Sequence, residues 1–247
     1  MTINKNERID DLQFEGLKII QNKNFFCFGI DSVLLSDFAK SLKSNGRVAD
    51  LGTGNGIVGL LLCKKSKLKE IIGVEIQEDV ADMAERSIKI NNLENKFKIL
   101  KVDINCIFKE NLLKKNSFDA VVMNPPYKEV GRGKTNENEN KLIARHEVKA
   151  TLTDFISTAS QLLKDKGELY LVHKPERIVD IMNEMRKFKI EPKEMRLVYP
   201  YKNEAPSIVL IKGVKSGKKF FSVEKPLIIY EPNGEYTQEI REIYSEN

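Results

Sequence analysis

The amino-acid sequence predicts an α/β protein with a doubly wound, mostly parallel sheet. Three observations support this fold class. From Arg47 onward short apolar runs alternate with amphipathic helical patterns, and such strand–helix–strand repeats form right-handed βαβ units. The chain has 247 residues, 41% of them hydrophobic, which is enough for one substantial core. No apolar run approaches the roughly 20 residues that a membrane-spanning helix needs.

The predicted elements follow one another along the chain. Residues 30–42 place apolar side chains at helical spacing, and Asp31 is a candidate N-cap of this helix. The alternating strands and helices are then RVADL, IVGLLLCKK, IIGVEI, EDVADMAERSIKINN, FKILKVD, FDAVVMN, LTDFISTASQLLK, GELYLVH and PERIVDIMNEMRKF. A short polar loop separates EMRLVYP from SIVLIKG, which predicts an antiparallel hairpin at the sheet edge. Beyond Gly217 we expect a strand-like piece, a turn at residues 232–234 and a terminal helix.

We expect one domain with short additions. Residues 46–213 form the core of this domain, residues 1–45 are an N-terminal extension packed on it, and residues 214–247 are a C-terminal extension. The segment 128–140 contains GRGKTNENEN. It is too polar to pack and predicts a mobile surface loop.

The composition limits the partners and the compartment. The chain has 41 basic and 36 acidic side chains, a net charge of +5, which supports an RNA partner without establishing one. The first residues are polar and carry acids, unlike a secretory signal or a transit peptide, so we expect a cytoplasmic protein. Cys27, Cys63 and Cys106 lie far apart among apolar neighbours, and we interpret them as small core residues rather than disulfides or metal ligands.

The first motif that carries chemistry is a glycine-rich turn. In VADLGTGNGIVGLLL a strand ends at Asp50 and the chain turns through Gly52, Gly54 and Gly56 into a helix. Glycines allow a sharp turn and let a ligand lie against bare amides at a helix N-terminus. Residues 54–59 match the G-x-G-x-x-G pattern of dinucleotide-binding enzymes. The acid followed by Leu-Gly-Thr-Gly-Asn-Gly, however, resembles the E/D-x-G-x-G-x-G signature of class I methyltransferases, and the earlier start of the turn favours that class.

Two further acids occupy successive strand ends, on the rim where ligands bind in α/β sheets. Glu75 closes IIGVEI and suits a bidentate hydrogen bond to an adenosyl ribose, whereas Asp103 closes FKILKVD and suits an adenine amine. Each acid taken alone is also compatible with a polar strand terminus or a helix cap. Three acids at three successive strand ends favour a ligand site.

The second motif is NPPY, into which the hydrophobic strand FDAVVM runs directly. Two prolines that merely end a strand would explain Pro125 and Pro126 but not the residues on either side. An amine conjugated to a planar ring is a poor nucleophile, because its lone pair is delocalised. If the Asn124 side-chain oxygen and the Pro125 carbonyl accept its two N–H groups, the nitrogen is drawn toward tetrahedral geometry, and Tyr127 can stack on the flat substrate. The motif therefore predicts methylation of such an amine without a strong base.

Taken together, these segments resemble the bacterial tRNA (adenine-37-N6)-methyltransferases that act on valine tRNA, a branch of the class I N6-adenine enzymes. The resemblance spans nearly the whole chain. The glycine turn and NPPY are shared by several families, so the discriminating segments are FFCFGIDSVLLSDFA, IARHE at residues 143–147 and the tail HKPERIVDIMNEMR…YPYKNEAPSIVLIKG. The resemblance implies a Rossmann-like fold with a seven-stranded sheet, S-adenosylmethionine as methyl donor and S-adenosylhomocysteine as product. It also implies tRNA as partner and no metal. The asparagine-rich residues 134–140 have no match in the family.

The motifs and the resemblance together give the expected site residues. The expected catalytic group is Asn124, Pro125, Pro126 and Tyr127. The expected cofactor contacts are Asp50, Gly52, Thr53, Gly54, Asn55, Gly56, Glu75, Ile76, Asp103, Ile104 and Asn124, to which the resemblance adds Phe28, Gly29 and Asp31. The candidate RNA contacts are Arg145, His146, Lys215, Lys218 and Lys219. Neither His146 nor His173 is expected to be catalytic.

Several alternatives stay open at this point. NPPY serves a carboxamide as well as an adenine, so a glutamine of a release factor is a possible substrate, although such enzymes carry a helical substrate domain before the glycine turn. DNA adenine methylation would need an inserted recognition domain, and residues 128–150 are too few to read bases in a groove. A short loop better suits a base already unstacked in an anticodon loop. A noncatalytic RNA-binding module is the remaining alternative, against which the intact motifs argue. The sequence does not specify the tRNA, any prior modification or a subunit interface, and we expect a monomer.

Overall fold

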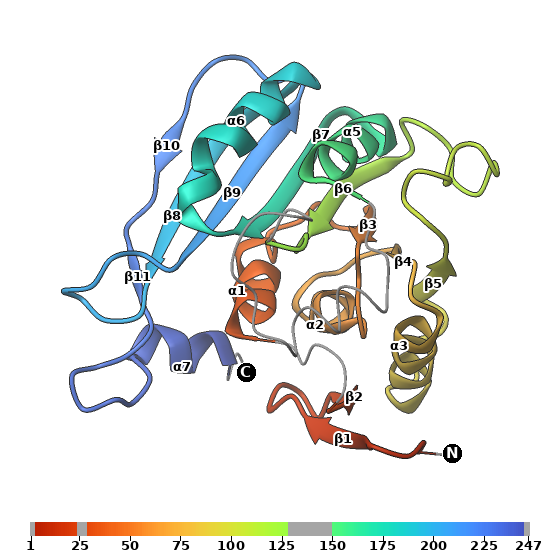
Figure 1. The fold of residues 1–247 in the computed structure, drawn as a ribbon, viewed down its shortest axis with the longest axis horizontal. Coiled ribbons are helices and arrows are strands. Elements are labelled where there is room, and N and C mark those ends of the chain that lie inside the picture. The colour runs from red at the N-terminus through yellow and green to blue at the C-terminus, as the bar shows by residue number, and fades with distance from the viewer. Residues whose placement is uncertain (1–2, 24–28, 128–149, 245–247) are drawn as a thin grey trace.

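The computed structural model describes residues 3–23, 29–127 and 150–244, and it has the predicted α/β architecture (Figure 1). The predicted loop at 128–140 and Cys27 lie outside these residues. Strands β5, β4, β3, β6 and β7 lie side by side and parallel, in that order, and β9 continues the sheet antiparallel to β7 and β8. The strands of this sheet are β3 (Arg47–Leu51), β4 (Glu70–Glu75), β5 (Phe97–Lys101), β6 (Phe118–Met123), β7 (Leu163–His173), β8 (Ile190–Tyr199), β9 (Ile208–Lys215), β10 (Ser222–Val223) and β11 (Leu227–Ile228).

Helices cover both faces of the sheet, as expected for a doubly wound fold. The described helices are α1 (Ile30–Phe38), α2 (Ile57–Lys65), α3 (Glu78–Ile90), α5 (Leu152–Leu162), α6 (Ile178–Lys187) and α7 (Gln238–Tyr244), with a 3₁₀ turn at Pro175–Arg177. Alternate residues of β7 serve opposite cores, because side chains along a strand point to opposite faces. Tyr170 and Val172 pack with α1 and α2, whereas Leu169 and Leu171 pack with α5 and α6. None of the described helices is long and apolar enough to cross a membrane.

Gly59 of α2 lies against the Phe97 ring of β5, where a side chain would not fit. A Cβ atom added at Gly59 would lie 2.3 Å from the Phe97 ring of β5. The described residues form three groups of buried apolar side chains. Cys63 of α2 belongs to the first group, together with residues of α1, and is buried as predicted. Cys106 is half-buried and packs against the second group, here called the second core, which contains the buried apolar residues of α5 and α6.

The predicted hairpin of β8 and β9 is confirmed, but it does not form the edge itself. The short strands β10 and β11 both pair with β8 and extend the sheet beyond it, so the described residues form nine strands in this sheet where seven were expected. The predicted turn follows, with Gly234 at φ 84°, and the predicted terminal helix is α7. Two stacked ring pairs hold this tail together. The ring centroid of Tyr236 lies 5.5 Å from that of Tyr230 and 5.6 Å from that of Tyr244 in α7.

The N-terminal extension contains an antiparallel hairpin that we did not predict. Strands β1 (Glu7–Asp11) and β2 (Lys18–Asn22) pair with each other and form a separate two-stranded sheet. Ile19 and Ile20 of β2 are fully buried. The hairpin therefore packs against its surroundings through β2 and through Leu12, Phe14 and Leu17 of the connecting segment, which are buried in the same apolar cluster as Ile19.

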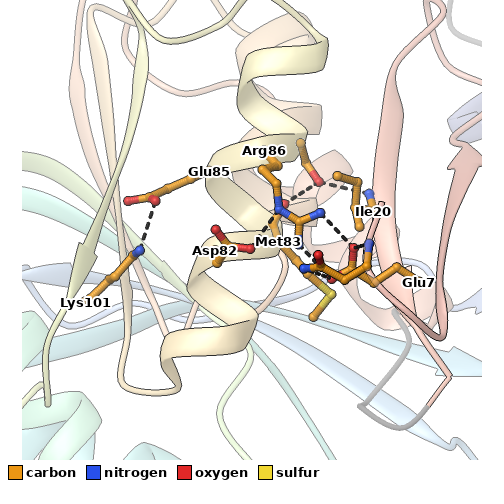
Figure 2. A network of polar contacts seen from close by, with 9 residues as sticks. Glu7, Ile20, Asp82, Met83, Glu85, Arg86 and Lys101 are labelled. Atoms are coloured by element: carbon orange, nitrogen blue, oxygen red, sulfur yellow. Dashed lines mark hydrogen bonds and ion pairs between the residues drawn. The ribbon is translucent and has the colours of Figure 1, made fainter. Parts of the chain in front are cut away.

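Polar contacts fasten the hairpin to α3 (Figure 2). The Arg86 guanidinium donates two hydrogen bonds of 2.7 Å to the Glu7 carboxylate and a third of 2.7 Å to Asp82. The Ile20 amide donates to the Ser87 hydroxyl at 2.9 Å. The Arg86 hydrogen bonds hold the pKa of Glu7 below its usual value. Glu7 and Arg86 therefore form an ion pair, here called the clamp, between two segments far apart in the sequence.

Candidate active site at the carboxyl edge of the sheet

The predicted site residues gather where the parallel strands end. Leu51, the last residue of β3, pairs with Met123 of β6 on one side and with Val74 of β4 on the other. The glycine turn and NPPY therefore leave the sheet side by side. Glu75 ends β4 next to them, and Asp103 follows β5. Four loops, which follow β3, β4, β5 and β6, thus meet at one edge, which is where α/β folds bind ligands.

The glycine turn depends on backbone conformations that other residues rarely adopt. Gly52, Gly54 and Gly56 have φ angles of 70°, 58° and 87°, all in the left-handed region. The amides of Gly52 and Thr53 donate to the Val74 carbonyl at 2.9 and 3.0 Å, which ties the turn to β4. A Cβ atom added at Gly54 would meet nothing within 4 Å. The turn therefore presents bare backbone to open space just before α2 begins.

Asp50 lies beneath this turn with only 1% of its surface exposed. The Thr53 hydroxyl donates to its carboxylate at 2.6 Å. Burial raises the pKa of Asp50 to about 7, the Thr53 hydrogen bond opposes that rise, and the charge of Glu75 adds to it. A cationic group that approached this carboxyl would favour its ionised form and so lower its pKa.

Glu75 and Asp103 are both engaged by backbone amides. Glu75 accepts hydrogen bonds from the amides of Gly54 at 3.0 Å and Gln77 at 2.9 Å, and burial raises its pKa. Asp103 accepts from the Asn105 amide at 2.8 Å and is half-buried. Of the hydrophobic neighbours, Ile76 is 45% exposed, whereas Ile104 is 6% exposed in the second core. Ile76 can thus offer its side chain to a ligand, while Ile104 has almost only backbone to offer.

The NPPY segment contacts the first turn of α1. The Asn124 Nδ2 donates to the Ser32 hydroxyl at 3.3 Å, and the Tyr127 hydroxyl donates to the Asp31 carboxylate at 2.6 Å. Pro125 is buried and Pro126 is exposed. Burial, followed by the negative charge of Asp31, raises the pKa of Tyr127. Its hydroxyl therefore keeps its proton and acts as a donor.

Two residues at the end of β7 complete the surroundings of Tyr127. The His173 ring centroid lies 5.1 Å from that of Tyr127, and the Lys174 ammonium lies 5.3 Å from the Tyr127 ring centroid. His173 is 1% exposed, and burial, followed by the charge of Arg177, lowers its pKa to about 4. The imidazole is therefore neutral near pH 7, in keeping with the structural role expected for it.

Asp31 is not the N-cap that the sequence predicted. Gly29 occupies the cap position without a side-chain hydrogen bond, and α1 begins at Ile30. Asp31 lies one residue inside the helix, where a carboxylate is still favourable, and Tyr127 supplies its partner. Local sequence rules could not foresee a partner 96 positions away. Ser32 was missed altogether, although it lies within the FGIDSVLL segment that marked this region.

The predicted RNA contacts that the structure describes are three lysines, and they do not lie at this edge. Lys215 ends β9, which runs antiparallel to β7 and so finishes at the opposite edge of the sheet. Its ammonium donates to the carbonyls of Ser160 at 2.6 Å and Leu163 at 2.8 Å, at the end of α5. Lys218 and Lys219 are exposed just beyond it. Phe28, Arg145 and His146 lie outside the described residues.

Comparison with known proteins gives a consistent picture. The family model of the methyltransferase small domain matches residues 17–188. A relative from Histophilus somni named tRNA1(Val) (adenine(37)-N6)-methyltransferase is 26% identical over 232 residues, covering 94% of both chains. A relative of the same name from Tolumonas auensis is 25% identical and covers 92% of this chain and 91% of its own.

Solved structures show the same fold. A predicted O-methyltransferase from Agrobacterium tumefaciens has a TM-score of 0.68 at 21% identity, covering 87% of this chain and 95% of its own. The M. jannaschii protein TYW2, crystallised in complex with AdoMet, has a TM-score of 0.57 at 15% identity and covers 87% of each chain.

Proposed function

This chain belongs to the methyltransferase small domain family, and we propose that it transfers a methyl group from S-adenosylmethionine to the N6 amine of an adenine in tRNA. The proposed target is adenine 37, beside the anticodon of a valine tRNA, as in the names of relatives that match over 94% of the chain. The observation that carries the proposal is the position of Asn124 and Pro125, which leave the sheet beside the glycine turn. A flat amine held by these two residues would face a ligand lying on that turn.

The residues at the carboxyl edge fit S-adenosylmethionine. The open space at Gly54 accommodates a ligand against the backbone, and the Asp50 carboxyl suits the ammonium of the methionine moiety. Glu75 suits the ribose hydroxyls, Asp103 suits the adenine amine, and the exposed Ile76 suits the adenine face. When bound, S-adenosylmethionine would supply an electrophilic methyl group on its sulfonium.

The remaining chemistry is positional. Within the described residues the Asn124 side-chain oxygen has no hydrogen-bond donor, so it is available to accept one N–H of the substrate amine. The Pro125 carbonyl accepts the other, and two consecutive prolines hold that carbonyl stiffly. Drawing both N–H groups out of the ring plane localises the nitrogen lone pair. The amine then loses its proton readily once it carries four bonds, so no strong base is needed, and neutral His173 is compatible with that.

The substrate that we propose is a base that is already unpaired. An unpaired base in an anticodon loop can enter the site without a separate domain for opening a duplex. Tyr127 offers a ring for stacking on that base, and Arg145, His146, Lys218 and Lys219 stay candidates for contacts with the rest of the tRNA. Such a substrate would place the enzyme in the cytoplasm. We also propose that residues 46–213 form the catalytic domain and that both extensions belong to it.

Mass spectrometry of nucleosides tests the proposal. Total tRNA from cells that lack this modification is incubated with the protein and S-adenosylmethionine, with the Asn124→Ala variant as control. The proposal expects N6-methyladenosine with the wild type and none with the variant. If no methyladenosine forms while S-adenosylhomocysteine still binds in calorimetry, the RNA substrate is wrong. A release factor incubated in parallel would then reveal methylation of a glutamine amide.

A further inference from the structure

We propose that the first turn of α1 is a positioning device for NPPY, in which Ser32 sets the orientation of the Asn124 amide and Asp31 fixes the ring of Tyr127. This inference rests on the proposed function, because it concerns how the same site presents its substrate-binding groups. It assigns Asp31 to the substrate side of the site rather than to the cofactor contacts implied by family resemblance. Neither Asp31 nor Ser32 touches the reacting atoms in this account.

The contact is specific to two adjacent helical residues. Ser32 is 4% exposed and Asp31 is 8% exposed, although both have polar side chains. Buried polar groups need hydrogen-bond partners, and here the partners are Asn124 and Tyr127, the first and last residues of the NPPY motif. One rigid helical turn therefore holds both ends of the motif.

In the structure Ser32 contacts the amino end of the Asn124 amide. A side-chain amide has a donor end and an acceptor end, and only the acceptor end can bind a substrate N–H. With Nδ2 donating to Ser32 at 3.3 Å, the oxygen is turned away from α1. If the amide rotated by half a turn, its NH₂ group would oppose the N–H of the amine. In the proposed device the Ser32 hydroxyl acts as the acceptor that holds the productive orientation, without being part of the chemistry.

The Asp31 contact fixes the plane of Tyr127. The two carboxylate oxygens of Asp31 have different partners. Oδ1 accepts from the Ser32 amide at 2.9 Å, and Oδ2 accepts from the Tyr127 hydroxyl at 2.6 Å. A hydrogen bond to a charged carboxylate is stronger than one between neutral groups. The His173 ring supports the tyrosine ring at 5.1 Å. A ring held by its hydroxyl and by its neighbour presents a pre-oriented surface to a flat substrate.

Substitutions on α1 test the device, and the helix itself provides a matched control. Ser36 is fully buried, and its hydroxyl donates to the Val33 carbonyl at 2.7 Å, so Ser36→Ala removes a buried hydroxyl without touching NPPY. We expect Ser32→Ala to lower kcat by roughly 10- to 100-fold, the scale of a small misplacement of reacting groups. S-adenosylhomocysteine affinity should stay within about twofold, and Ser32→Thr, which keeps the hydroxyl, should recover most of the rate. Equal losses in Ser32→Ala and Ser36→Ala, or a matching loss of affinity, would overturn the proposal.

Asp31 is tested by a double-mutant cycle with Tyr127. Asp31→Ala and Tyr127→Phe each remove the same hydrogen bond, so the double variant should be no slower than the slower single variant. If the two effects on kcat multiply, the residues act independently and the proposed link is wrong. If Asp31→Ala instead weakens S-adenosylhomocysteine binding at unchanged kcat, Asp31 belongs to the cofactor site.

A measurement without turnover separates this proposal from the proposed function. The side-chain NH₂ resonances of Asn124, assigned with Asn124→Asp, are recorded by NMR in the wild type and in the two serine variants. They should shift in Ser32→Ala and stay in place in Ser36→Ala, whatever the substrate proves to be. Unshifted resonances in Ser32→Ala would refute the positioning role, even for an enzyme that methylates tRNA.

Discussion

The buried carboxyl of Asp50 predicts that cofactor binding depends on pH in the physiological range. Burial raises the pKa of Asp50 to about 7, so near neutrality only part of the protein carries the charge that an ammonium group would seek. A bound ammonium favours the ionised form, and by linkage the ionised form binds more tightly. Below about pH 7.7 the ligand's amino group stays mostly protonated. In that range the pH dependence reports the protein.

The size of the effect follows from one titrating group. If only ionised Asp50 binds, the apparent dissociation constant is inversely proportional to the ionised fraction, and it should rise roughly 25-fold between pH 7.5 and pH 5.5 for a pKa near 7. Thr53 offers a second perturbation, because its hydroxyl donates to this carboxylate at 2.6 Å. Losing a hydrogen bond to a charged group costs ~1.5–3 kcal/mol, or ~1–2 pKa units. Thr53→Val should therefore raise the pKa of Asp50 further and weaken binding at pH 7 by roughly 5- to 50-fold.

Calorimetric titration with S-adenosylhomocysteine at several pH values measures both effects. Asp50→Asn is the main control and should bind weakly with a flat pH profile. Glu75→Gln is the second control, because burial raises the pKa of Glu75 as well, and this variant should keep the slope. A flat wild-type profile, or an Asp50→Asn variant with wild-type affinity, would refute the ammonium contact. Asp50 would then serve only to support the glycine turn through Thr53.

Three further predictions concern other parts of the structure. Asn124→Ala should abolish methyl transfer while S-adenosylhomocysteine affinity changes by less than about twofold in calorimetry, since the amide acts on the substrate. An Asn124→Ala variant that kept the wild-type turnover would contradict the mechanism. Gly59→Ala should destabilise the fold by ~1–3 kcal/mol in thermal unfolding, because its Cβ would lie 2.3 Å from the Phe97 ring; an unchanged melting temperature would show that α2 can shift. Arg86→Ala should lower the free energy of unfolding by ~1.5–3 kcal/mol in urea, and an unchanged midpoint would show that the clamp contributes nothing. Because the pKa of Glu7 is lowered in the fold, the clamp should stabilise above the unfolded value of about 4.5 and weaken as the pH falls through the folded value.

The parts of the fold that were predicted are those that local patterns encode. Apolar periodicity identified the strands and helices of the sheet, and the carboxyl ends of parallel strands had to meet at one edge. The hairpin of β1 and β2 carries no such pattern, since Glu7–Asp11 is mostly polar. Its order depends on contacts with α3, such as the Ile20 amide on Ser87. A pattern within one segment cannot reveal a partner that another segment supplies.

The same reason explains why the contacts of some site residues were not predicted. The glycine turn and NPPY are contiguous motifs, so the sequence displayed them whole. The contacts between α1 and NPPY join residues more than 90 positions apart, and a helix-cap rule assigned Asp31 to a different task. Composition made Lys215 a candidate for RNA contact, whereas the structure places its ammonium on carbonyls at the end of α5. Charge counts do not show which lysines are already bonded inside a protein.

The conformations of the glycines also predict how this chain tolerates mutation. At Gly54, with φ 58° and no neighbour within 4 Å of an added Cβ, a saturation scan should rank asparagine and aspartate above alanine, and alanine above valine. At Gly59, which faces the Phe97 ring instead, the ranking should follow side-chain volume alone. No single-nucleotide change turns a glycine codon into an asparagine codon, although aspartate is one change away from some of them. A single-nucleotide change at Gly54 can therefore reach a backbone-compatible residue only together with a new negative charge on the glycine turn.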